Sequence, residues 1–332
     1  MAGFIVSFLL GFLPCLLFSY IVYLLDRYEK EPVLLLGGVF TWGAVIAAGA
    51  AFLINSVLSI GIYLFSGSDI ITEVGTGSFI APVVEESLKG LAVLIIYVIF
   101  RGEFDSILDG IVYAAVTALG FAATENVYYI FTYGYIDHGW TGLLSIAFIR
   151  VVLVGWQHPF FTAFTGIGLA ISRLSRNWAI KLLAPVLGWT FAVSAHALHN
   201  TILTVTSGIT STIVGSLVDW LGWTCMFGFV ICAIHRERIC NINYLKDEPQ
   251  LGTITEGQYR IACSAWSQTL ARLKSINSNK YRKINRFYQL CGELAHKKQQ
   301  YIALGEKQEN VQKIASIRQE LTQLASQIPA AL

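Results

Sequence analysis

The feature that most constrains the fold is a series of seven apolar windows, each close to the length that a helix needs to cross a bilayer. They fall at about 3–24, 33–55, 77–100, 106–132, 143–171, 179–204 and 210–234. A spanning helix needs about 20 mostly apolar residues. Composition agrees, since 55% of the 332 residues are hydrophobic, 13% are charged and the mean hydropathy is +0.60. We therefore predict an all-α polytopic membrane helix bundle with about seven transmembrane helices.

Lysine and arginine alternate between the connectors of these windows. They occur after the first, third, fifth and last windows and are absent from the other connectors. The segment from Arg236 onward holds 15 Lys and Arg against 8 Asp and Glu. Because basic loops stay in the cytoplasm, we expect the N-terminus outside, the C-terminus inside and a location in the cell inner membrane. The lipid bilayer is the expected surrounding, and no nucleic-acid partner is expected.

The chain divides by character into a transmembrane core at 1–235, a linker at 236–252 and a cytosolic helical tail domain at 253–332. Thr253 and Glu256 have capping-box spacing, and a second helix is expected after Asn277-Ser278. Apolar residues then recur at helical spacing, at Ile284, Phe287, Leu290 and Leu294, and at Ile314, Ile317, Leu321, Leu324 and Ile328. This pattern favours a local helical bundle. The alternative is a coiled-coil homo-oligomer, or an arm that binds a cytosolic partner.

Three ionisable residues, Glu85, Glu86 and Lys89, lie inside the third apolar window. A charged side chain near the centre of a spanning helix costs about 2.5–3.5 kcal/mol on insertion scales, so such groups are kept when they pair or face a polar cavity. At spacings of three and four residues, Lys89 can reach both acids. The functional interpretation is a buried catalytic or ion-handling centre, and the structural alternative is a neutralised pair that only holds helices together.

Further polar residues recur in the next three windows: Glu125, then His158, then His196, His199 and Asn200. Counting residues along each helix places Glu85, Glu125 and His196 at one level of the outer half of the membrane. His196, His199 and Asn200 share one face. Pro159 predicts a helix loosened next to His158. Each residue taken alone can also be an interhelical hydrogen-bonding group, with His199 a neighbour that supports His196.

Four motifs in order resemble those of the PrsW family of intramembrane proteases, which is related to the CAAX prenyl protease and ABI proteins. They are Glu85-Glu86-Ser-Leu-Lys89, Phe121-Ala-Ala-Thr-Glu125-Asn126, His158-Pro159 and His196-Ala-Leu-His199-Asn200, with a similar connector at Asp26–Pro32. The resemblance covers about residues 1–235 and does not extend to the tail.

The resemblance implies peptide-bond hydrolysis inside the membrane, with Glu85 as general base. Glu86 orients Lys89 or the water, Glu125 and His158 complete water activation, and His196 with Asn200 stabilises the oxyanion. In a metalloenzyme version, zinc is held by Glu85, Glu125, His158 and His196, with Glu86 as base. The residues leave both versions open.

The function predicted from these features is an intramembrane endopeptidase that cuts a single-pass membrane protein, similar to an anti-sigma factor, near the extracytoplasmic face, as in regulated intramembrane proteolysis. The alternative is a proton- or ion-coupled transporter that uses the same cluster as a relay. The sequence shows no internal repeat of the kind that many transporters have.

Overall fold

The structure, a computed structural model, describes residues 1–206, 208–276, 280–305 and 308–328, and these residues contain helices and no strand. The predicted all-α class is confirmed. The chain forms two compact units. Unit 1 comprises Met1–Tyr23, Pro32–Arg173 and Asn177–Phe229, and unit 2 comprises Leu24–Glu31, Leu174–Arg176 and Val230–Leu332. The predicted domain limits at 235 and 252 stay a prediction.

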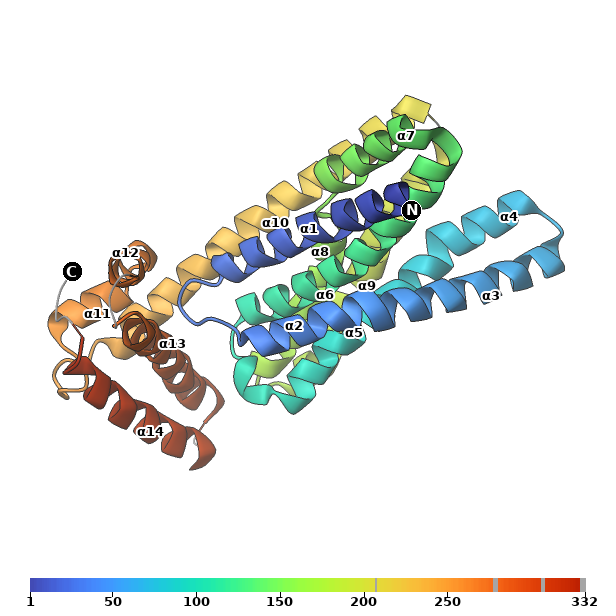
Figure 1. Ribbon diagram of the computed structural model, residues 1–332. Coiled ribbons are helices and arrows are strands. Elements are labelled where there is room, and N and C mark those ends of the chain that lie inside the picture. Colours follow the sequence, from blue (N-terminus) through green and yellow to red (C-terminus); the bar gives the residue numbers. More distant parts are fainter. Residues whose placement is uncertain (207, 277–279, 306–307, 329–332) are drawn as a thin grey trace. The chain divides into compact units, whose positions relative to one another are not determined.

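Unit 1 is built from long apolar helices joined by short π-helical and 3-10 segments (Figure 1). In chain order the elements are α1 (Ala2–Leu25), α2 (Val33–Thr41), η1 (Trp42–Ala47), α3 (Ala48–Ser66), α4 (Asp69–Glu73), η2 (Val74–Ile80), α5 (Ala81–Ile99), η3 (Arg101–Glu103), α6 (Ile107–Tyr129), η4 (Ile130–Ile136), α7 (Asp137–Ala147), η5 (Phe148–Leu153), α8 (Gln157–Leu174), α9 (Trp178–Val205) and α10 (Gly208–Leu245). Residues of α10 from Val230 onward belong to unit 2.

Five largely helical stretches among the described residues are long and apolar enough to cross a membrane. They are Ala2–Leu25, Val33–Ser66, Ile107–Leu174, Trp178–Val205 and Gly208–Leu245. The protein is therefore a multi-pass membrane protein, and the predicted number of about seven spans is not confirmed. α5 has 19 residues and is of similar length, but it carries three charged side chains.

The core of unit 1 is α6, in which every residue from Leu108 to Ala123 is buried. Glycine lets neighbouring backbones approach it closely. A methyl group at Gly43 would lie 2.0 Å from the carbonyl oxygen of Thr117, and one at Gly120 would lie 2.0 Å from that of Phe40. Small residues allow such contacts between membrane helices, where there is no hydrophobic drive for association. These two contacts bring the backbone of α6 close to those of α2 and η1.

The predicted fifth window, 143–171, is not one helix. α7 and η5 end at Leu153, a turn follows, and α8 begins at Gln157. Pro159 is the third residue of α8, where a helix needs no donor from the backbone nitrogen. It therefore starts a helix, and the expectation that it loosens one was wrong. His158 consequently lies in the first turn of α8.

Unit 2 contains four further helices, α11 (Glu256–Ala262), α12 (Ala265–Ser275), α13 (Tyr281–Leu304) and α14 (Gln308–Ala325). Their apolar stripes meet in one core that includes Phe287, Leu290, Leu294 and Leu321, as the local-bundle interpretation requires. The predicted capping box was two residues early, since Thr255 and Gln258 form it. Asn277-Ser278, where a new helix was expected, lies outside the described residues.

Two short connectors are part of unit 2. The hydroxyl of Tyr28, which is 1% exposed, accepts a hydrogen bond from the backbone of Ala265 at 3.2 Å. Arg176 donates to the carbonyl of Ile302 at 3.1 Å. The connectors after the first and fifth windows therefore belong to the same unit as the tail.

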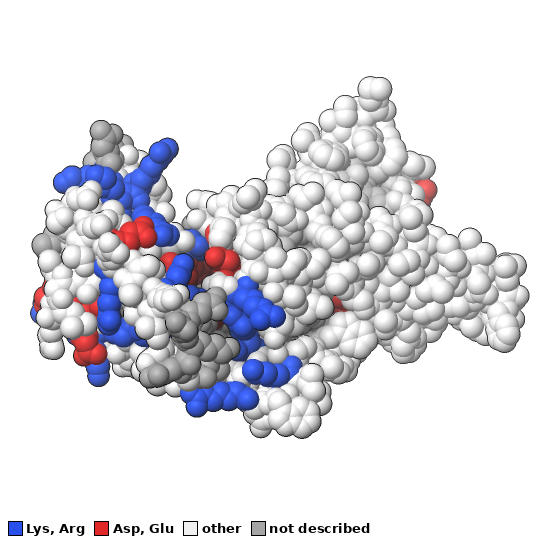
Figure 2. Space-filling model, turned by 90° about the horizontal axis from the view of Figure 1, so that it is seen from below, with Lys and Arg blue, Asp and Glu red and all other residues white. Residues whose placement is uncertain are grey.

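Charge divides the surface. On the face shown in Figure 2, Lys and Arg gather over the tail and connectors, and the remaining surface is almost uncharged. Large apolar side chains of unit 1 are exposed, among them Leu34 (87%) and Phe65 (95%). An apolar exterior of this extent marks a surface that contacts lipid.

Unit 2 contains a buried ion cluster around Glu248, which is fully buried. Arg318 donates to both of its carboxylate oxygens, and Lys298 donates at 2.8 Å. Burial by itself raises the pKa of Glu248, but the hydrogen bonds from Arg318 and Lys298 outweigh it and hold that pKa below its ordinary value. The resulting stabilisation is present above the pKa of the unfolded carboxyl and is lost as pH falls through the lowered value.

We expect Glu248→Gln to destabilise the tail by about 1–3 kcal/mol near neutral pH, because a charge-assisted set of hydrogen bonds is lost. Hydrogen exchange of α13 and α14 amides in the full chain measures the effect. The matched control is Glu320→Gln, whose ion pair with Arg286 is exposed and which should cost less than about 1 kcal/mol. Equal protection in the two variants, or a difference that persists in strong acid, would contradict this account.

Candidate active site

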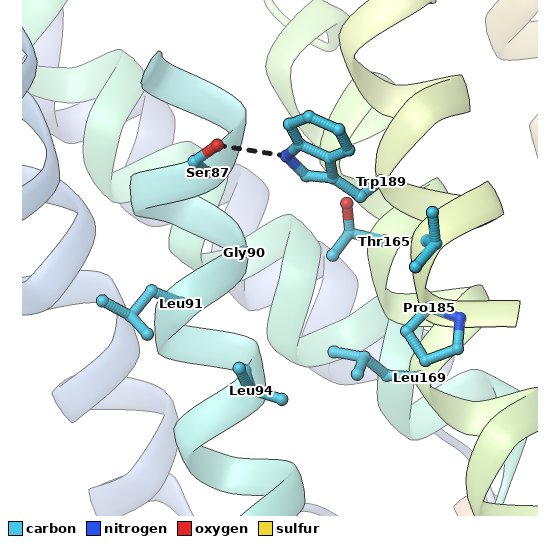
Figure 3. A pocket seen from close by; sticks show the side chains of 9 residues that line it. Ser87, Gly90, Leu91, Leu94, Thr165, Leu169, Pro185 and Trp189 are labelled. Carbon is cyan, nitrogen blue, oxygen red and sulfur yellow. Dashed lines mark hydrogen bonds between the residues drawn. The ribbon is translucent and has the colours of Figure 1, made fainter. Parts of the chain in front are cut away.

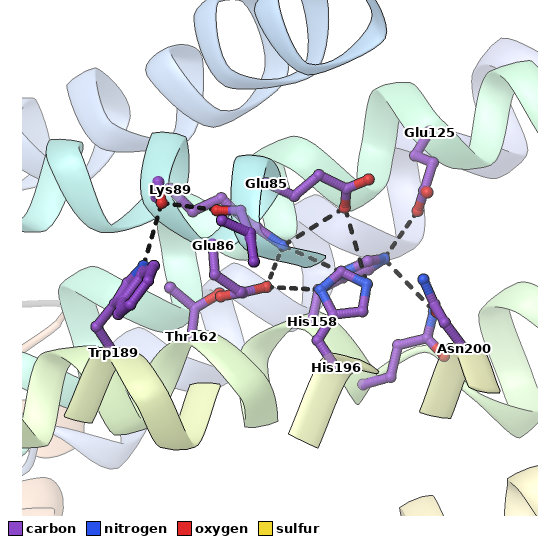
Figure 4. Close-up of polar contacts among 12 residues, drawn as sticks. Glu85, Glu86, Lys89, Glu125, His158, Thr162, Trp189, His196 and Asn200 are labelled. Carbon is purple, nitrogen blue, oxygen red and sulfur yellow. Dashed lines mark hydrogen bonds and ion pairs between the residues drawn. The ribbon is translucent and has the colours of Figure 1, made fainter. Parts of the chain in front are cut away.

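Lys89 lies at the centre of the polar cluster in α5 (Figure 4). Its ammonium is 2.5 Å from Oε1 of Glu86 and 4.0 Å from Oε2 of Glu85. Lys89 and Glu86 have no exposed surface, and Glu85 is 7% exposed. The spacing of three and four residues predicted that Lys89 reaches both acids, and in the structure one cation does face two acids on one side of the helix.

Glu86 joins α5 to α8 and α9. Its Oε2 accepts a hydrogen bond from the hydroxyl of Thr162 at 2.8 Å, and its Oε1 lies 3.0 Å from Nδ1 of His196. Together with Lys89, Glu86 has three donors. Both of its carboxylate oxygens are therefore engaged.

A second carboxylate, Glu125 of α6, holds the other histidine. Nε2 of His158 is 2.8 Å from Oε2 of Glu125, and Arg150 of η5 forms an ion pair with the same oxygen. Arg150 also donates to Oδ1 of Asn126 at 2.7 Å, and its guanidinium lies 4.3 Å from the ring centre of Tyr129. Arg150 thus supplies the positive charge that pairs with Glu125.

The hydrogen-bond partners decide which nitrogen of each imidazole carries the proton. The Lys89 ammonium can only donate, so Nδ1 of His158, 3.4 Å away, is an acceptor, and its Nε2–H points to Glu125. By the same argument, Nδ1–H of His196 donates to Glu86, which leaves a lone pair on Nε2. Each histidine therefore has one nitrogen held by a carboxylate and one nitrogen able to bind a cation.

Glu85 completes this arrangement. Its Oε1 receives a long hydrogen bond of 3.4 Å from Asn55, and among the described residues its buried Oε2 has no hydrogen-bond donor. Oε2 lies 3.8 Å from Nε2 of His196. Glu85, His158 and His196 each offer one ligand atom, and these atoms lie within 4.8 Å of one another. Two imidazoles and one carboxylate form a donor set used by catalytic zinc, so the residues fit a metal.

The other predicted site residues lie around this donor set. Glu125, predicted as a fourth ligand, instead bonds His158 and Arg150. Asn200 donates to the carbonyl of Gly77 in η2 at 2.8 Å, which ties α9 to the segment before α5. Its role at an oxyanion stays a prediction.

His199 pairs with a buried acid that the sequence interpretation missed, Asp219 of α10, at 3.0 Å. The ring of Phe161 lies between the imidazoles, with ring centres 4.9 Å from His196 and 5.8 Å from His199. His199 therefore contacts the cluster through the ring of Phe161, and its own hydrogen-bond partner is Asp219.

Arg150 and Thr162 were also missed as site residues. A signal was present for Arg150 and Asp219, because a single charge inside an apolar window is itself an indication of a buried partner. Thr162 gives no such signal, since threonine is common in membrane helices and can bond its own backbone.

Acids and imidazoles from α5, α6, α8 and α9 thus meet inside a bundle of apolar helices, which defines a polytopic membrane protein with a buried cluster of ionisable side chains. A family model described as PrsW family intramembrane metalloprotease matches residues 31–233, and the chain belongs to that family. The family predicted from the four motifs is confirmed, and the protein is an intramembrane protease that acts on a membrane protein substrate. The transporter alternative gains no support from the comparisons.

Curated relatives carry the name Protease PrsW. The chain is 29% identical to that of Oceanobacillus iheyensis over 58% of this chain and 80% of the relative, and 33% identical to that of Bacillus subtilis over 47% and 64%. It is 36% identical to that of Clostridioides difficile over 38% and 50%. No solved structure matches the chain.

Because Arg150 supplies the charge beside Glu125, we expect Arg150→Met to lower the free energy of unfolding by about 3 kcal/mol, since a carboxylate then lacks its cation inside the membrane. Unfolding with a denaturing detergent, followed by tryptophan fluorescence, measures the change.

The double variant Arg150→Met/Glu125→Leu should recover part of that loss, because an apolar pair replaces the ion pair while His158 loses its acceptor. Arg101→Met, which removes an exposed arginine, is the control and should have little effect. A single variant as stable as the native chain would contradict the pairing.

Proposed function

We propose that this intramembrane endopeptidase is zinc-dependent and that Glu85, His158 and His196 hold the metal. The observation that carries the proposal is the paired arrangement of the two histidines. Glu86 and Glu125 each hold one imidazole nitrogen, and one ligand atom from each of Glu85, His158 and His196 lies within 4.8 Å of the other two. Metal-binding histidines are commonly oriented by carboxylates in this way.

A metal at this site would supply Lewis acidity, which activates water and polarises the scissile carbonyl. The remaining steps belong to the side chains. Glu86 is the acid next to the donor set and accepts the proton of the attacking water. The same proton passes to the amine nitrogen as the carbon–nitrogen bond breaks, so Glu86 ends the cycle as it began.

Lys89 and Glu125 have supporting roles in this scheme. Lys89 balances the charge of two acids, at 2.5 Å from Glu86 and 4.0 Å from Glu85. Glu125 holds His158 in the tautomer whose Nδ1 carries a lone pair, which here faces the Lys89 ammonium at 3.4 Å. Arg150 in turn holds Glu125.

The proposed substrate is a single-pass membrane protein similar to an anti-sigma factor, cut near the extracytoplasmic face of the cell inner membrane. The alternation of Lys and Arg between connectors supports an N-terminus outside and a C-terminus in the cytoplasm. The packing of two connectors that carry Lys or Arg into the same unit as the tail supports this topology, since these segments must lie on one side of the membrane.

We expect Glu85→Gln to abolish cleavage of single-pass substrates by the purified protein and to lower its bound zinc from about one ion per chain to near none. Metal analysis and a cleavage assay on the same sample test this. Glu73→Gln is the matched control, because Glu73 is exposed and lies twelve residues earlier in the same run of helical segments. Proton flux without cleavage would favour transport instead.

Glu125→Gln separates orientation from ligation. If Glu125 acts through His158, the variant should still bind zinc, with an affinity about 10–100-fold lower. Titration with a competing chelator gives the affinity. Native protein that cleaves substrate without any metal and is insensitive to chelator would overturn the zinc assignment and return Glu85 to the role of general base.

A further inference from the structure

A groove of about 310 Å³ lies between α5, α8 and α9, next to the catalytic cluster (Figure 3). Leu94 on α5 and Val186 on α9 are 40% and 58% exposed at its sides, and Gly90 and Thr165 are buried at its floor. From Ser87 to Leu94 the groove follows α5 for seven residues, or about 10 Å. It is therefore long enough to contact about two turns of a helix that lies across it.

The groove is continuous with the cluster along all three helices. Ser87 follows Glu86 directly, and Thr165 is one turn after Thr162, which bonds Glu86. Trp189 lies two turns before His196 and donates to the hydroxyl of Ser87 at 3.2 Å. This hydrogen bond is at the end of the groove that faces Glu86. A chain lying in the groove would therefore lead to the cluster past Ser87 and Trp189.

The floor of the groove is suited to a helix more than to a lipid chain. The hydroxyl oxygen of Thr165 is buried and has no hydrogen-bond partner among the described residues. An acyl chain has no polar group to offer it, whereas a helix has backbone carbonyl oxygens whose second lone pair can accept a hydrogen bond from the hydroxyl. Gly90 presents no side chain, and a methyl group there would already lie 3.2 Å from Thr165. A smooth floor of this kind allows a second helix to approach through its own small residues.

A second groove on unit 1 provides the contrast. It lies between α1 and the segment before α8, has a volume of about 480 Å³, and is lined only by apolar residues, Leu13 and Val152 among them. Phe18 and Trp156 stack across it at 4.7 Å. Nothing in its lining distinguishes a peptide from a lipid chain.

We propose that the groove at Gly90 and Thr165 seats the transmembrane helix of the substrate, with a face of small residues against the floor. This inference rests on the proposed function and names the class of substrate that the site selects. The hydrogen bond between Ser87 and Trp189 marks where the bound chain must pass to reach Glu86.

Photocrosslinking in liposomes tests the proposal in the Glu85→Gln chain, in which no cleavage is expected. Benzoylphenylalanine is placed at Leu94, or at Val152 as the matched control, since both side chains are exposed on apolar surfaces. The probe is a synthetic single-span leucine peptide with a Gly-xxx-Gly face, compared with the same peptide carrying leucine at the two glycines. From position 94 we expect about fivefold more crosslinking to the glycine peptide, a ratio in the range of helix packing effects in membranes.

Position 152 should not distinguish the two peptides. Equal crosslinking of both peptides from position 94, or crosslinks to lipid alone, overturns the groove assignment whether or not the native chain cleaves substrates. Selective crosslinking in a protein that proves inactive would keep the helix site and overturn the proposed function only. Gly90→Leu, which fills the floor, should abolish the preference for the glycine peptide.

Discussion

The structure depends on one buried cation, the ammonium of Lys89. It has no exposed surface, and the carboxylates of Glu85 and Glu86 lie at 4.0 and 2.5 Å. Removing one partner from such a group in a low-dielectric interior leaves an uncompensated charge, which is strongly destabilising. Glu86 then extends the network to Thr162 and His196 on two other helices. The same contacts that neutralise Lys89 therefore bring α8 and α9 to α5, and the positions of the imidazoles follow from charge pairing.

Much of this site could be predicted because its signals are local. Charges inside apolar windows are costly, and spacings of three and four residues place side chains on one helical face, so Glu85, Glu86 and Lys89 were expected to act together. Counting residues along the helices placed Glu125 and His196 at one depth, and the structure brings both beside His158. The all-α class followed from the apolar windows alone.

What the sequence could not provide is the choice of partners between helices. Arg150 lies inside the fifth apolar window, and nothing along the chain indicates that it reaches Glu125 and Asn126. Asp219 pairs with His199 across α9 and α10 in the same way. Hydropathy also merged α7, η5 and α8 into one window, since the turn at Gly155 is as apolar as its surroundings. Local patterns predict which groups must be paired, and packing decides with which.

The three chain segments that make up unit 2 constrain how the chain passes through the membrane. Leu24–Glu31, Leu174–Arg176 and the tail pack into one compact unit, so they lie on the same side of the bilayer. An even number of crossings must therefore separate the first connector from the second, and the second from the tail. Two hydrogen bonds connect these segments to the tail, one between Tyr28 and Ala265 and one between Arg176 and Ile302. The positive-inside rule would assign this shared side to the cytoplasm because the tail is basic, which is the orientation proposed above.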